Sequence, residues 1–165
     1  MKHLFLTLIT MIAFSSCADG QQKNISAEAK SKKLMALDGT EVALSQIIDK
    51  HAGKTIVIEV WASWCGDCVK AMPKLKAMQL QNPAADYVFI SMDRTEAAWR
   101  AGIEKHELTG DHYWAAEGMK GSFAKAIDLD WIPRYMIIDK NGQVVTYRAI
   151  ETDFDALNAT LKTLE

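Results

Sequence analysis

The sequence has 165 residues and a formal net charge of -2, with 49% hydrophobic and 24% charged residues. This is the composition of an ordinary globular protein, and the length is sufficient for one domain with its own hydrophobic core. Nucleic acids and anionic surfaces are recognised by clustered positive charge, which this chain lacks. We therefore expect no nucleic-acid partner.

The N-terminus has the features of a targeting segment. A short basic start, Lys2 and His3, precedes an apolar run at residues 4–14, which is too short to span a bilayer and suits the hydrophobic region of a signal peptide. Two serines and Cys17 follow at once. The block resembles a bacterial lipoprotein signal, although Phe14 stands where an aliphatic residue is usual. The resemblance implies that Cys17 is lipidated, which would anchor the chain to a membrane; the alternative is plain secretion.

This interpretation divides the chain into three parts. Residues 1–16 are the expected signal peptide, and residues 17–33 are the expected lipidated cysteine with a flexible polar tether. Residues 34–165 form the expected folded domain.

The domain alternates between strand and helix patterns. A hairpin at 34–44, turning at Asp38-Gly39, comes first. Periodicity then predicts strands at 55–61, 87–92, 113–115, 134–139 and 143–148, and helices at 66–80, 95–106, 122–127 and from Thr152 onward, the last with a capping box to Asp155. The expected fold is a three-layer α/β sandwich whose central mixed sheet is parallel early and antiparallel late.

Cys65 and Cys68 are the only cysteines of the expected domain. A disulfide between them closes too small a loop to stabilise the fold much, so the pair indicates chemistry or metal binding. Cys65 follows a strand at the start of a helix, where free N-H groups and the helix dipole stabilise a thiolate. We expect Cys65 to attack a disulfide, and Cys68, one helical turn deeper, to resolve the mixed disulfide.

Glu59 is a carboxylate in an otherwise apolar strand, between Ile58 and Val60. If both faces of the strand are buried, desolvation raises the pKa of Glu59. A buried carboxylate behind the cysteines is suited to take the proton of Cys68. The alternative is a structural or edge-exposed glutamate.

The segment V-W-A-S-W-C-G-D-C, with Pro73 after it and Ile132-Pro133 before a late strand, resembles the membrane-tethered TlpA/ResA-like group of thioredoxin-fold proteins. This resemblance implies a thioredoxin-like domain with an N-terminal hairpin and an extra βα segment around 95–128. It also implies a cis peptide at Ile132-Pro133, where the backbone of Ile132 pairs with substrate. Trp64 is expected to shape the substrate-facing surface, and no cofactor is implied.

Gly66 and Asp67 separate the cysteines and are expected to tune their redox behaviour. Asp67 departs from the family, where many members have proline. Its negative charge opposes the thiolate of Cys65, and a less stable thiolate makes a less oxidising disulfide. We therefore expect a reductant of protein disulfides that serves cytochrome c maturation or disulfide repair. It is expected in the cell envelope, facing the periplasm or the cell surface. A membrane thiol donor is expected to re-reduce it.

Other interpretations of the Cys65 and Cys68 pair have less support in the sequence. A zinc site with His106 and His112 does not have finger spacing, and haem attachment needs histidine where Val69 stands. A copper carrier on the same fold usually spaces its cysteines by three residues. A peroxiredoxin-type thiol peroxidase needs threonine where Ala62 stands. The expectation is therefore an enzyme without a metal.

Overall fold

The computed structural model describes residues 24–165. Within them, seven strands form one sheet in the order β2-β1-β5-β4-β3-β6-β7. Their bounds are β1 Lys33–Ala36, β2 Glu41–Ala43, β3 Ile56–Trp61, β4 Asp86–Ser91, β5 Asp111–Trp114, β6 Arg134–Ile138 and β7 Val144–Ala149. β3, β4 and β5 are parallel to one another, whereas β6 joins β3 and β7 joins β6 in antiparallel fashion. The predicted mixed sheet is confirmed, and the N-terminal hairpin extends it by pairing β1 with β5.

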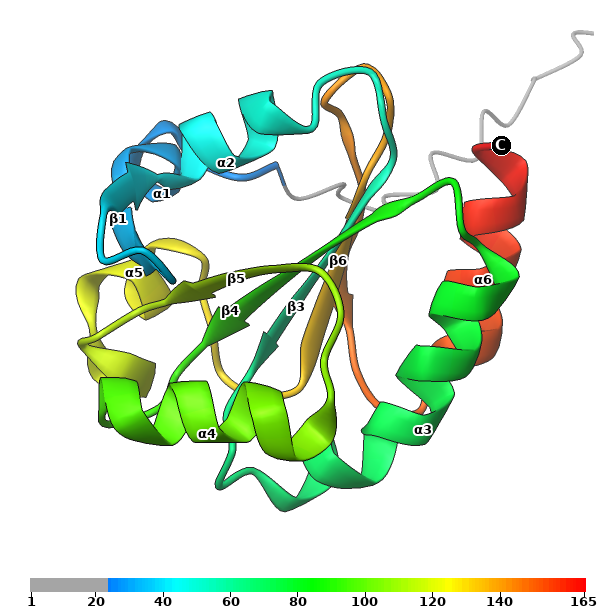
Figure 1. Ribbon diagram of the computed structural model, residues 1–165. Coiled ribbons are helices and arrows are strands. Elements are labelled where there is room, and N and C mark those ends of the chain that lie inside the picture. The colour runs from blue at the N-terminus through cyan, green and yellow to red at the C-terminus, as the bar shows by residue number, and fades with distance from the viewer. Residues whose placement is uncertain (1–23) are drawn as a thin grey trace, which may run out of the picture.

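Helices cover both faces of this sheet, as predicted for a three-layer sandwich. They are α1 Ala27–Ser31, α2 Leu44–Lys50, α3 Gly66–Gln81, α4 Glu96–His106, α5 Ser122–Ala126 and α6 Phe154–Thr163, with a 3-10 turn, η1, at Gly118–Lys120. α3, α4 and α6 lie on one side of the sheet, and α1, α2 and α5 lie on the other (Figure 1). None of the helices in residues 24–165 is both long enough and apolar enough to cross a bilayer.

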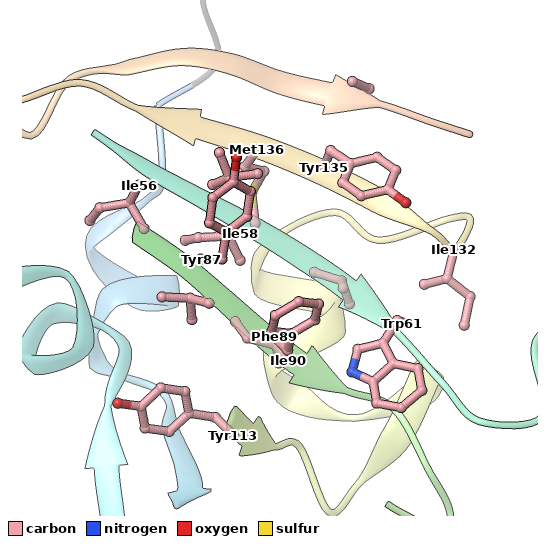
Figure 2. Close-up of a cluster of buried hydrophobic side chains, with 14 of the residues drawn as sticks. Ile56, Ile58, Trp61, Tyr87, Phe89, Ile90, Tyr113, Ile132, Tyr135 and Met136 are labelled. Atoms are coloured by element: carbon pink, nitrogen blue, oxygen red, sulfur yellow. The ribbon is translucent and has the colours of Figure 1, made fainter. Parts of the chain in front are cut away.

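The hydrophobic core forms where helices cover both faces of the sheet. All six residues of β3 are buried, because both of its faces meet a helical layer. Aliphatic and aromatic side chains from β3, β4 and β6 pack together in the centre (Figure 2). Glu59 therefore lies in the interior, with 1% of its surface exposed.

The folded region begins earlier than the sequence predicts. The side chain of Ser26 accepts a hydrogen bond from the N-H of Ala29 at 3.0 Å and starts α1, a five-residue helix inside the expected tether. Ile25 and Ala29 are buried in the core. The prediction of a flexible segment up to residue 33 is therefore wrong from residue 25 onward, while the signal peptide, Cys17 and residues 18–23 lie outside the described residues.

The last helix begins later than expected. α6 starts at Phe154, and Asp153 is its N-cap residue. The carboxylate of Asp153 accepts the N-H of Ile150 at 2.9 Å instead of capping the helix. The predicted capping box of Thr152 and Asp155 is not formed, because a turn occupies the chain up to residue 153.

Candidate functional site

The two cysteines lie at the N-terminus of α3, where β3 delivers the chain. Cys65 is the N-cap residue, and Cys68 is in the first turn. They form a disulfide with a Cα–Cα separation of 5.3 Å. The N-H of Cys68 points at the Sγ of Cys65, 3.1 Å away. A backbone donor and the helix dipole thus both face the atom on which negative charge forms when the disulfide opens.

The two sulfur-bearing residues differ in exposure. Cys65 keeps 6% of its surface exposed, whereas Cys68 is 0% exposed. An attacking thiol must meet the sulfur of another protein, and only Cys65 has an open side. This asymmetry follows from the position of Cys68 within the helix, on the face that packs against the sheet.

The loop before β6 lies against the cysteines. The Ile132-Pro133 peptide bond is cis, as the family resemblance implies. The carbonyl oxygen of Ile132 lies 3.5 Å from the Sγ of Cys65. Figure 2 shows Ile132 just before the start of β6, beside the end of β3 and near Trp61. Residues separated by 67 positions in the chain are therefore neighbours at the site.

A cleft of about 350 Å³ opens beside Cys65. Two exposed tryptophans flank it, Trp64 with 54% and Trp131 with 52% of its surface accessible. Its lining also includes Gly66, Asp67, Met119, Asp130 and Ile132. Sequence reasoning placed Trp64 and Ile132 here but missed Met119 and Asp130, since neither lies in a recognisable motif or periodic pattern.

Asp67 lies in the first turn of α3 and forms an i,i+3 ion pair with Lys70 at 3.5 Å. Its side chain is 38% exposed, so this pair is weakened by solvent. The structure therefore places a partly screened carboxylate between the two cysteines. A Cβ added to Gly66 would meet open space, so packing does not require glycine there.

Glu59 is paired across the sheet with Tyr135, its register partner on β6. The Tyr135 hydroxyl donates to Oε1 of Glu59 at 3.1 Å, while Oε2 has no hydrogen-bond partner among the described residues. Burial raises the pKa of Glu59 to about 8, and the Tyr135 hydrogen bond opposes this rise. At neutral pH the carboxyl is therefore mostly protonated in the disulfide form. Tyr135 was not predicted from the sequence.

Asp93 fastens the loop that carries Trp64 and Cys65. It follows β4, is fully buried, and accepts hydrogen bonds from the N-H and hydroxyl of Ser63 at 3.1 and 2.7 Å. α4 approaches the same loop closely, because a Cβ on Gly102 would lie 2.8 Å from the Cβ of Ser63. The position of the cysteine pair thus depends on contacts from two neighbouring elements.

An ionic network holds the loop that carries Asp130 and Trp131, which line the cleft. Buried Arg134 pairs with Asp130, and Arg148 binds Asp130 at 2.8 Å and Asp128 at 2.6 Å. Because Asp130 precedes Trp131 directly and both line the cleft, this network fixes the part of the cleft wall that they form.

Of the two histidines weighed as metal ligands, His112 has partners inside the fold, and His106 is the last residue of α4. His112 is buried in β5, stacks on Phe89 with ring centroids 5.0 Å apart, and its Nε2 lies 3.2 Å from the carbonyl oxygen of Leu108. Within residues 24–165 no group of three or more His, Cys, Asp or Glu side chains is arranged to hold a metal ion.

Known structures share this architecture. The thioredoxin domain of a thiol-disulfide oxidoreductase from Bacteroides vulgatus superposes with a TM-score of 0.68 at 19% identity, covering 87% of this chain and 99% of that one. The fold is therefore thioredoxin-like. Residues 11–161 match the Redoxin family, and the chain belongs to that family.

Curated relatives add the chemistry. The chain is 23% identical over 130 residues to the thiol-disulfide oxidoreductase ResA of Bacillus cereus, covering 78% of this chain and 71% of ResA. It is 30% identical over 124 residues to a probable nucleoredoxin 1 of Arabidopsis thaliana, but spans only 20% of that longer protein. The chain is a ResA-like thiol-disulfide oxidoreductase, with Cys65 and Cys68 as its C-x-x-C pair.

Proposed function

We propose that this protein reduces disulfide bonds of other proteins outside the cytoplasm, with Cys65 as the attacking residue. The observation that carries the proposal is the difference in exposure, 6% for Cys65 and 0% for Cys68, at the N-terminus of one helix. The helix N-terminus favours a thiolate at Cys65, and the buried partner is protected from competing reactions.

The reaction balances over the two cysteines. The Cys65 thiolate attacks one sulfur of the substrate disulfide, forms a mixed disulfide, and releases the other substrate sulfur as a thiolate. The Cys68 thiol then loses its proton and attacks the Sγ of Cys65, which releases the second substrate sulfur. The substrate gains two electrons, and the Cys65–Cys68 disulfide remains.

Glu59 is the proposed proton carrier for Cys68. In its ionised form it accepts the proton of the Cys68 thiol as that thiol attacks. In the reverse direction, the protonated carboxyl returns a proton to Cys68 when a thiol donor opens the disulfide. A pKa of about 8 keeps both forms of Glu59 accessible near neutral pH.

Ile132, Pro133 and Trp64 are the proposed substrate-binding residues. The Ile132 carbonyl, 3.5 Å from Cys65, is placed to accept a hydrogen bond from an extended substrate chain, and Trp64 supplies an exposed aromatic wall. The electron donor is a membrane thiol protein, and the substrates are misoxidised proteins or the cysteines of apocytochrome c.

Two further parts of the proposal concern direction and location. Gly66 and Asp67 tune the pair toward reduction, because the Asp67 carboxylate disfavours a thiolate next to it. Cys17 is the lipid attachment site, which keeps the domain on the outer side of a membrane in the cell envelope.

Trapping tests the activity directly. Cys68→Ala should accumulate mixed disulfides on Cys65 in the native organism, whereas Cys65→Ala, Cys68→Ala should capture none. Reduced wild-type protein should also reduce insulin. If the single variant captures no partner and insulin remains oxidised, the proposal fails. A reduction potential near the strongly oxidising end of the C-x-x-C range would refute the assigned direction alone.

A further inference from the structure

A second hollow lies on the other side of Trp64. It measures about 470 Å³, and its lining includes Met92, Arg94, Glu117 and Lys120. It shares Trp64 and Met119 with the cleft at Cys65. The two hollows therefore adjoin, and a chain that lies in the cleft beside Cys65 can continue past Trp64 into the second one.

The charged side chains of the cleft are paired with neighbouring basic side chains, whereas the cations of the second hollow are not paired in the part of the chain that the structure describes. At the cleft, Asp67 is paired with Lys70, and Asp130 is paired with two arginines. In the second hollow, Arg94 and Lys120 are exposed and form no ion pair within residues 24–165.

Glu117 is the one acidic side chain that lines the second hollow. Its carboxylate accepts the N-H of Ser122, and this hydrogen bond lowers the pKa of Glu117. Against this one anion the hollow carries two cations, Arg94 and Lys120, which leaves a net charge of +1 next to an apolar surface of Met119 and Trp64.

We propose that the second hollow binds an acidic segment of the substrate polypeptide, next to the cysteine that reacts with Cys65. The inference rests on the proposed function, and it names the substrate class of the same site. Met119 and Trp64 contact the aliphatic part of a glutamate or aspartate side chain, while Arg94 and Lys120 meet its carboxylate.

The effect should be moderate and sensitive to salt. Exposed ion pairs each contribute little, so two of them should change kcat/KM by roughly threefold to tenfold. Because solvent ions screen such pairs over about 3 Å at 1 M salt, the preference should disappear there. It should appear mainly in KM, since the cations lie beside the reacting sulfurs and not on them.

Two oxidised peptides of equal length test the proposal. One carries glutamates and the other lysines on both sides of the disulfide-bonded cysteine. Their reduction is followed with the reduced full-length protein and with Arg94→Glu, Lys120→Glu. The matched control is Lys74→Glu, Lys162→Glu, which makes the same charge change at exposed positions outside both hollows.

The wild type and the control should prefer the acidic peptide, and the reversed variant should prefer the basic one. If the reversed variant does not fold, Arg94→Gln, Lys120→Gln should instead abolish the preference. Equal kcat/KM for both peptides with every protein overturns the inference and leaves the proposed reductase standing. If the wild type reduces neither peptide and Cys68→Ala captures no partner, the proposed function fails as well.

Discussion

Replacing Glu59 with glutamine should change how the stability of the protein depends on pH. The pKa of Glu59 rises from an ordinary 4.5 to about 8 in the folded protein, because burial disfavours its charged form. Between these two pH values the unfolded chain has lost the proton and the folded protein still holds it. Stability therefore decreases as the pH rises from 4.5 toward 8, and it levels off above that.

The magnitude follows from the size of the shift. At 1.36 kcal/mol per pKa unit, the interval from 4.5 to about 8 corresponds to roughly 5 kcal/mol of lost stability. Glutamine cannot ionise, and its amide oxygen can still accept the Tyr135 hydrogen bond. The advantage of Glu59→Gln over the wild type should therefore grow with pH by up to about 5 kcal/mol.

Urea unfolding of the oxidised protein from pH 5 to 9 measures this difference. Replacing Cys17 with serine in all variants leaves only the Cys65–Cys68 pair and prevents disulfide exchange. Glu104→Gln, on the exposed side of α4, is the control and should run parallel to the wild type. Parallel curves for Glu59→Gln and the wild type would refute the assignment of a buried, protonated carboxyl to Glu59.

Three further substitutions follow from the contacts around the site. Tyr135→Phe removes the hydrogen bond that lowers the pKa of Glu59, so the pH at which stability levels off should move upward from about 8. Asp93→Ala leaves the N-H and hydroxyl of Ser63 without their acceptor, which should lower the free energy of unfolding by about 1–3 kcal/mol and slow mixed-disulfide formation. Gly102→Ala inserts a Cβ against Ser63 and should destabilise by about 1–3 kcal/mol in urea unfolding.

Each of these has a matched control. Tyr87→Phe removes a buried hydroxyl that donates to Met78, so the pH at which stability levels off should not move. Asp93→Asn keeps an acceptor and should lose less stability than the alanine variant. Gly66→Ala places its Cβ in open space and should not destabilise the fold. Equal effects within any pair would contradict the contact assigned to it.

Much of the architecture could be predicted because periodic apolar segments dominate this chain. The buried run at Ile56–Trp61 and the helix from Gly66 have clear patterns, and their order limits the possible sheet topologies. α1 was missed because a five-residue helix with one fully buried residue, Ala29, has no detectable period. The start of α6 depends on the turn at Asp153, which competes with the predicted cap.

The residues of the candidate site also fall into those that the sequence predicts and those that it does not. Cys65, Cys68 and Glu59 are visible in the sequence because their residue types conflict with their surroundings. The position of Ile132 and Pro133 beside them came from a family resemblance, since no local pattern links Cys65 to Ile132, 67 positions away. Met119, Asp130 and Asp93 reach the site only through tertiary packing, which a single sequence does not encode in its spacing.

The use of Cys65 as the N-cap of α3 affects the choice of an inactive protein for experiments. Serine is among the best N-cap residues and alanine is poor, with a difference of about 1 kcal/mol. Cys65→Ser should therefore keep the first turn of the helix intact while removing the sulfur. Cys65→Ala should also let that turn fray. A loss of binding in the alanine variant could then come from the missing sulfur or from the frayed turn, whereas in the serine variant it would come from the missing sulfur alone.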